Sequence, residues 1–140
     1  MTENYKIIGS FIKDMSSETP NTPTYIFVRD KISKYRLNID INSKAVKNGI
    51  IEVNTIIKFS DQPEILKKAH FEITYTTIVK VDEKVSDKKE MEKIILCDVP
   101  SKIYPQLEKI FLNLLSDSGY PGIKFHKKVD FIELFKKKSN

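Results

Sequence analysis

The single cysteine and the two histidines are the residues of this chain that could combine into a catalytic site. Cys97 could act as a nucleophile if His70 or His126 lay beside it as a base. The sequence alone does not establish that these side chains lie close together, and no third residue that would orient the histidine can be named. The alternative is that Cys97 is a small buried apolar residue. We therefore expect a protein that is not an enzyme, and keep an enzyme that depends on Cys97 as the last of three hypotheses; the other two are given below.

The chain lacks the residue patterns that define the best-marked catalytic signatures and metal sites. With 4 glycines, the chain contains neither a glycine-rich phosphate loop nor a nucleophile elbow. No cysteine and histidine cluster has the spacing of zinc ligands. We expect no cofactor and no metal.

Length and composition indicate one domain over residues 1–140. Hydrophobic residues make up 40% of the chain and charged residues 31%, which is ordinary for a globular protein. Residues 1–6 are polar and begin no signal peptide, and no apolar run approaches the roughly 18 residues of a membrane span. A lone cysteine fits a reducing compartment. We therefore expect a cytoplasmic protein without membrane insertion.

The net charge of +5 raises the possibility of a nucleic-acid partner. From Lys124 onward six lysines accompany Asp130 and Glu133, so this segment carries +4 and the remainder of the chain only +1. The segment lacks the interleaved aromatic residues that stack on bases. We expect no nucleic-acid partner. A small basic nucleic-acid-binding module, with binding that falls steeply with salt, is the second hypothesis.

Alternating apolar and polar residues predict strands over 33–42, 51–60 and 68–81. The pair at 48–49, Asn-Gly, is typical of a two-residue hairpin turn between the first two of them. Three consecutive half-buried strands favour an antiparallel sheet with one face in water. Residues 5–13 alternate imperfectly and carry apolar groups on both faces, which is typical of an edge or interface strand.

The segment 15–25 is rich in Ser, Thr, Asn and Pro and predicts a loop, not a strand. Residues 82–93 are densely charged and predict a surface connection ending in a short helix. A long helix is expected to begin near Pro105 and to end before Gly119, and a short last helix to begin at Asp130. Strands followed by helices predict the α+β class.

Four local patterns, in order along the chain, are similar to those of one family. They are FIKDMSSETPNTP at 11–23, FEITYTTIV at 71–79, VPSKIYP at 99–105, and GYP at 119–121 followed by VDF at 129–131. In this order and spacing they resemble the SecB family of export chaperones over nearly the whole chain.

The resemblance implies an α+β fold with a four-stranded antiparallel sheet, one long helix and a short C-terminal helix packed on one side. It implies a homotetramer built as a dimer of dimers. The implied function is that of a holdase, which binds unfolded precursor proteins and delivers them to the SecA translocation motor. A divergent relative that serves a toxin-antitoxin client is the alternative within the family.

The resemblance also implies roles for three sets of residues. The set expected to contact SecA is Asp14, Glu18 and Glu72. The set expected to line the client groove is Tyr25, Phe27, Phe125, Phe131 and Phe135. The set expected to be buried by a helix or at an oligomer interface is Phe71, Ile73 and Tyr75. Independently of the resemblance, the alternation along 68–81 places Glu72 on the face opposite the last set.

Overall fold

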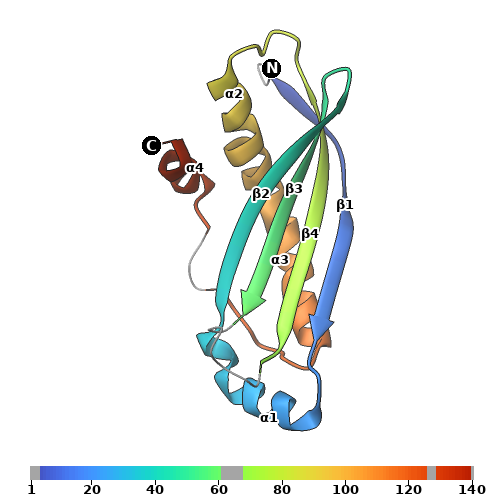
Figure 1. Cartoon of the computed structure of the whole chain (residues 1–140), viewed down its shortest axis with the longest axis vertical. Helices are drawn as coiled ribbons and strands as arrows, with labels where there is room; N and C mark the ends of the chain where they lie inside the picture. The colour runs from blue at the N-terminus through green and yellow to red at the C-terminus, as the bar shows by residue number, and fades with distance from the viewer. Residues whose placement is uncertain (1–3, 61–67, 126–128, 140) are drawn as a thin grey trace.

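The computed structural model describes residues 4–60, 68–125 and 129–139 (Figure 1). The strands are β1 (Tyr5–Glu18), β2 (Arg36–Lys47), β3 (Ile50–Ser60) and β4 (His70–Val81). The helical elements are α1 (Thr22–Lys31), the 3₁₀ turn η1 (Ile32–Lys34), α2 (Lys88–Lys93), the π turn η2 (Ile94–Asp98), α3 (Val99–Asp117) and α4 (Phe131–Ser139).

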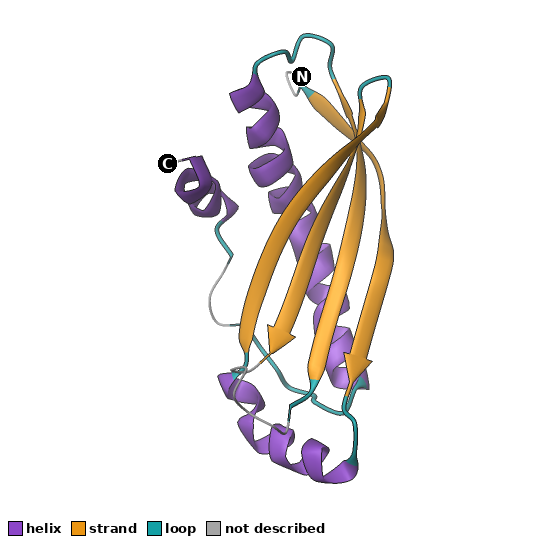
Figure 2. Cartoon of the chain, in the orientation of Figure 1, coloured by secondary structure: helices purple, strands orange, loops and turns teal. Residues whose placement is uncertain are grey.

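The four strands form one antiparallel sheet in the order β1-β4-β3-β2. Figure 2 shows α2, η2 and α3 as one continuous helical run lying across a single face of this sheet, with α1 at one end of the strands. The predicted α+β class and the four-stranded antiparallel sheet are confirmed. No helix within the described ranges is long and apolar enough to cross a membrane.

The hairpin between β2 and β3 turns at Asn48 and Gly49, as predicted. Both residues have positive φ angles, 48° and 77°, as a type I′ turn requires. Leu37 then pairs with Phe59, and Asn42 pairs with Asn54. Lys47 pairs with Ile50 next to the turn, and a bulge between Ala45 and Lys47 then shifts the register by one residue. The turn and the bulge together set the register that puts the apolar residues of both strands on the same face.

Strand β1 is an edge strand, and two bulges explain its imperfect alternation. The register with β4 shifts between Ile7 and Gly9 and again between Ile12 and Asp14. Each bulge inserts one extra residue, so the side chains that follow it face the other way than a strict period of two predicts. Apolar residues consequently occur at both odd and even positions of one strand.

The predicted loop over 15–25 was wrong. Strand β1 continues to Glu18 and helix α1 begins at Thr22. The Asn21 side chain accepts a hydrogen bond from the backbone N–H of Thr24 at 2.9 Å, and Pro23 occupies the first turn. Residues that mark turns also cap helices, since both uses satisfy backbone amides that have no intrahelical partner.

The predicted start of the long helix near Pro105 was also wrong, because the helical run begins at Lys88 and Pro105 lies inside α3. The π turn carries a hydrogen bond from the Val99 N–H to the Ile94 carbonyl. This wider turn sits directly before Pro100, whose ring would clash with the carbonyl four residues earlier in a regular α-helix. The turn therefore lets the helix pass through a proline.

The core lies between α3 and the inner face of the sheet. Leu107, Phe111 and Leu115 lie on one side of α3 and are fully buried, as are Ile57 and Phe71 on the sheet. They belong to one cluster of contacting side chains. Burying each such side chain contributes about 1.5–3 kcal/mol, so this seam holds the helix against the sheet.

The short C-terminal helix begins where the sequence predicted. The Asp130 carboxylate accepts a hydrogen bond from the Glu133 N–H at 3.1 Å and caps α4. Helix α4 packs against η2, the π turn of the long helical run. In Figure 1 it lies beside β2, on the side of the sheet opposite β1.

Candidate functional site

A groove with a volume of about 880 Å³ runs between β2 and the C-terminal segment. One wall is the first part of β2, and the other comes from residues 124–125 and from the start of α4. Its apolar lining consists of Tyr35, Leu37, Ile39, Phe125, Val129 and Leu134. The groove is open and partly apolar, which suits an extended chain better than a compact ligand.

A smaller hollow continues the groove toward the long helix. It is lined by Ile39, Ile41, Leu96, Leu134 and Phe135. Ile39 and Leu134 belong to both hollows. The two therefore form one apolar path along β2, between the strand, the π turn and α4.

Strand β2 gives this path a second property. It is the last strand of the described sheet and pairs with β3 on one side. The backbone groups on its other side are directed outward, where an added strand can accept and donate hydrogen bonds. Since an extended peptide can pair with such an edge while its side chains enter an apolar groove, β2 and the groove can bind a chain of many sequences.

Two of the five aromatic residues predicted to line a client groove lie here. Phe125 contacts Phe59 at 5.6 Å and Phe111 at 6.2 Å between ring centroids, and it lines the larger hollow. Phe135 lines the smaller hollow. Phe125 therefore joins the groove to the core, because its ring contacts both.

The other three aromatic residues lie elsewhere. The Tyr25 ring contacts Tyr120 at 5.3 Å, and Phe131 is 3% exposed with its ring 5.5 Å from Tyr104. Burial raises the pKa of the Tyr104 phenol. Phe27 is exposed on α1. These residues do not belong to the described lining of the groove, and their role in client binding stays a prediction.

Sequence reasoning missed the aliphatic part of the groove. Leu37, Ile39 and Ile41 alternate along β2 and were recognised as one face of a strand. They are partly buried against the core. What the alternation could not reveal is that β2 lies at the sheet edge, since strand order depends on contacts between distant segments.

The three carboxylates predicted to contact a motor protein share one face of the sheet. Glu72 pairs with Ser16 in the register between β4 and β1, and Asp14 and Glu18 lie two residues to either side of Ser16. Alternation directs all three away from α3. Diagonal neighbours of this kind lie about 7–8 Å apart, so the three side chains form one group.

A lysine and a histidine lie beside this acidic group. The Glu72 carboxylate lies 3.7 Å from the Lys58 ammonium and 3.7 Å from His70 Nε2, and the Glu72 side chain is 26% exposed. The face that carries Glu72 is therefore mixed in charge at this point.

A polar network occupies the middle of the same outer face. Thr76 donates to Asn54 at 2.7 Å, and the Asn54 amide donates to Asn42 at 2.9 Å and to Glu52 at 3.0 Å. Lys13 forms an ion pair with Glu52 at 3.0 Å. Hydrogen bonds from Asn54 and then from Lys13 lower the pKa of Glu52. The network satisfies the buried polar groups of Asn54 and Thr76, which is the usual requirement for such groups.

Phe71, Ile73 and Tyr75 lie on the inner face, opposite Glu72. They are 0%, 0% and 8% exposed within the single chain and belong to the core cluster below α3. The chain therefore already buries them by itself, and their contribution to an oligomer interface stays a prediction.

The catalytic hypothesis finds little geometric support. Cys97 is buried in the π turn, and burial, then the neighbouring Asp98 charge, raise the pKa of its thiol. His70 is exposed at the start of β4, beside Glu72 on the outer face of the sheet. His126 lies outside the described residues. Over the described ranges, no group of three or more His, Cys, Asp or Glu side chains could hold a metal ion.

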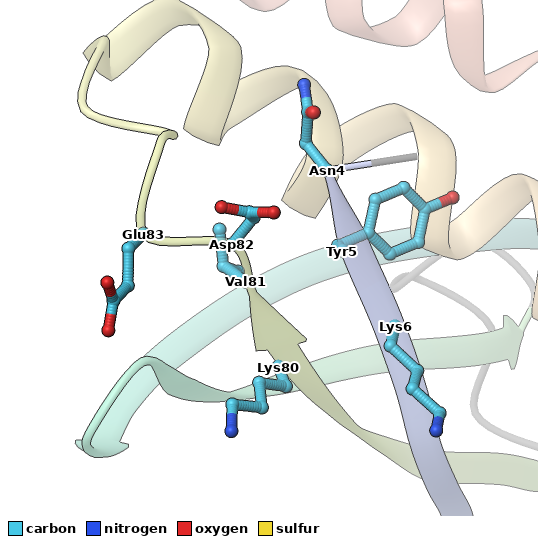
Figure 3. Close-up of a pocket in the computed structure, with 7 residues that line it drawn as sticks. All are labelled: Asn4, Tyr5, Lys6, Lys80, Val81, Asp82 and Glu83. Carbon is cyan, nitrogen blue, oxygen red and sulfur yellow. The ribbon is translucent and has the colours of Figure 1, made fainter. Parts of the chain in front are cut away.

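Another hollow, of about 400 Å³, lies at the end of the sheet near the N-terminus (Figure 3). Lys6 and Lys80 line it together with Asp82 and Glu83. Asp82 accepts a hydrogen bond from the Lys84 N–H at 2.9 Å, which forms a turn after β4. Charges of both signs and ordinary turn chemistry give this hollow no apolar surface comparable to that of the groove.

One solved structure has the same arrangement of sheet and helix. It is the SecB-like chaperone of Mycobacterium tuberculosis in complex with a ChAD peptide from the HigA1 antitoxin. Its TM-score is 0.66 at 11% identity, over 89% of this chain and 91% of that chain. The fold is therefore that of the SecB-like chaperones. A family model described as preprotein translocase subunit SecB matches residues 1–140, and the chain belongs to the SecB family of protein-export chaperones.

Two relatives agree with this assignment. A Pelagibacter ubique protein assigned as a protein-export protein SecB is 88% identical over 140 residues, which is 100% of both chains. The protein-export protein SecB of Bartonella bacilliformis is 22% identical over 136 residues, covering 96% of this chain and 82% of that protein. The resemblance inferred from four sequence patterns is confirmed.

Proposed function

We propose that this chain is a cytosolic holdase that binds unfolded precursor proteins along the groove beside β2, without catalysis, and keeps them competent for export. The observation that carries the proposal is an unpaired sheet edge directly beside an apolar groove. The edge offers backbone hydrogen bonds to any sequence, and the groove selects for apolar side chains. An unfolded precursor presents both features, whereas its folded form hides them.

The groove residue Leu134 provides a direct test. It is 38% exposed, lines both hollows and lies on the same helix as Ile132, which is 55% exposed and lies outside them. Leu134→Gln is expected to weaken binding of a permanently unfolded precursor about 5- to 10-fold, since about 1–1.4 kcal/mol of apolar contact is lost. Fluorescence titration of the labelled precursor measures the effect.

Ile132→Gln is the matched control and should leave the affinity unchanged. Equal affinities for the two variants and the parent protein would place the client elsewhere. Because both positions are exposed, neither variant is expected to unfold the chain, and a thermal unfolding curve checks this.

Delivery to SecA is the finer part of the proposal. It rests on Asp14, Glu18 and Glu72, which lie together on the outer face, away from the groove. A motor that docks there leaves the bound client accessible. Electrostatic docking of this kind weakens as salt rises.

Glu72→Lys tests this docking surface. The change places a second lysine beside Lys58, and SecA affinity is expected to fall about 3- to 10-fold at low salt, equivalent to about 0.7–1.4 kcal/mol. Client affinity should not change. Glu83→Lys makes the same change in net charge at the opposite end of β4 and serves as the control. Unchanged SecA affinity in a calorimetric titration of Glu72→Lys would remove this surface from the proposal.

A second candidate function has support from one structural neighbour. The M. tuberculosis chaperone was solved with a peptide from an antitoxin, so a toxin-antitoxin client for this chain is the alternative to an export precursor. Competition between an antitoxin-derived peptide and an unfolded precursor distinguishes the two. If export precursors are the clients, an unfolded precursor should displace the antitoxin peptide from the groove and then be transferred to SecA.

A further inference from the structure

Three cations line the groove and have no close carboxylate partner in the described part of the chain. They are Arg36 on β2, Lys124 before the helix, and Lys137 on α4, and all three are exposed. The ion pairs within 4 Å that the described residues form involve other lysines and arginines. The positive charge at the rim of the groove is therefore available to a ligand.

Two carboxylates also line the groove, but they occupy the first turn of α4. Asp130 caps that helix through the Glu133 N–H, and Glu133 itself lies in the first turn. Carboxylates at this position are held by the unpaired amides and the positive end of the helix dipole. Their charge is thus partly offset within the helix, while the three cations have no comparable local partner.

An extended peptide is suited to a groove that has an apolar lining, here called the floor, and exposed cations at its open side, here called the rim. Successive side chains of a strand point to opposite sides. A peptide that pairs with β2 would therefore direct alternate side chains toward Leu37, Ile39 and Phe125, and the side chains between them toward the rim. On that side β2 presents Arg36, with Asp40 four residues further along the strand, and Lys124 and Lys137 approach from the segment across the groove. A carboxylate beside Arg36 or at the open side of the groove would be attracted, whereas a lysine there would be repelled.

We propose that the groove selects unfolded segments in which apolar residues alternate with Asp or Glu, and discriminates against segments that alternate with Lys or Arg. This inference rests on the proposed holdase function and names the class of client segment that the same groove prefers. The observation that carries it is an apolar groove lined by three cations that form no ion pair with the described residues.

The test uses the full chain and three peptides of equal length. The peptides share the same apolar residues and carry Glu, Gln or Lys at the alternate positions. At an ionic strength of about 0.05 M, the Glu peptide is expected to bind about 3- to 10-fold more tightly than the Gln peptide, and the Lys peptide more weakly than both. Raising the ionic strength to about 0.3 M should bring the three affinities together, because these charges are exposed.

Charge reversal at the rim tests the assignment of residues. Arg36→Glu with Lys124→Glu should invert the order of the peptides, and Arg36→Gln with Lys124→Gln should make their affinities nearly equal. The matched control is Lys6→Glu with Lys80→Glu, which makes the same change in net charge in the hollow of Figure 3. The control should preserve the original order.

The peptide titrations also separate charge selection from the holdase function. If the three peptides bind equally well to the parent protein, charge selection is overturned and the holdase function stands. If none of them binds, both are overturned. If a single-stranded oligonucleotide displaces the Glu peptide and binds with steep salt dependence, the cations serve a nucleic acid and the proposal is overturned.

Discussion

Phe71→Ala is expected to lower the free energy of unfolding by about 3–5 kcal/mol, the range for removing a buried aromatic side chain. Phe71 is 0% exposed in the middle of the core. Its ring centroid lies 5.4 Å from that of Tyr120, 6.3 Å from Phe59 and 6.4 Å from Tyr35. Three aromatic neighbours cannot collapse fully into the space that the ring leaves, so a cavity penalty adds to the loss of apolar burial.

Urea unfolding at a single protein concentration measures this effect. Phe27→Ala is the matched control, since Phe27 is 37% exposed on α1. The control should cost less than about 1 kcal/mol, as exposed substitutions usually do. A Phe71→Ala variant that loses no more stability than Phe27→Ala would contradict the assignment of β4 to the core.

The strands were predicted correctly because their signal is local. In β3, Val53, Ile57 and Phe59 alternate with polar residues, and the Asn48-Gly49 turn joins this strand to β2. A period of two together with a turn that requires positive φ angles leaves few alternatives. This is why the sheet could be inferred before any contact was known.

The helices were harder to predict, because the same residues support more than one local structure. Asn21 and Pro23 are equally typical of a turn and of a helix N-terminus, and α1 was therefore missed. Pro105 is typical of a first helical turn, yet it lies inside α3. The π turn before Pro100 was missed as well, because a proline usually marks a helix end, and only the wider turn lets the helix continue through it.

The candidate site was predicted only in part for a related reason. Aromatic residues were the natural choice for a client groove, and Phe125 and Phe135 do lie along it. The groove, however, is created by the position of α4 beside the edge of β2. That position follows from tertiary packing against the π turn, and therefore Ile39 and Leu134 could not be selected from sequence.

Strand β1, at the edge of the described sheet opposite β2, carries several exposed apolar residues. Four large apolar side chains of β1 are 43–55% exposed, namely Ile8, Phe11, Ile12 and Met15. A surface strand of a lone chain that carries so much exposed apolar area is expected to associate with another chain. The proposed homotetramer, a dimer of dimers, would bury these residues and link several grooves on one particle, so that weak contacts along one client add up.

Phe11→Glu with Met15→Glu should therefore reduce the particle to smaller species. Two apolar side chains that the assembly would bury are replaced by charges, and we expect the dissociation constant of the assembly to rise about 1000-fold or more, equivalent to about 4 kcal/mol. Light scattering coupled to size exclusion, over a range of protein concentrations, measures the mass directly. The same variant should bind a long unfolded client more weakly while a short peptide, which occupies one groove, binds as before.

The control for this prediction lies on α1. Ile26→Glu with Phe27→Glu introduces the same charge and removes similar apolar side chains, which are 50% and 37% exposed there. It should leave the mass of the particle unchanged. A parent protein that runs as a monomer, or a β1 variant with the mass of the parent assembly, would show that β1 is not the surface of association. Loss of assembly in the β1 variant together with weaker holding of long clients, but not of short peptides, would tie holding strength to the number of linked grooves.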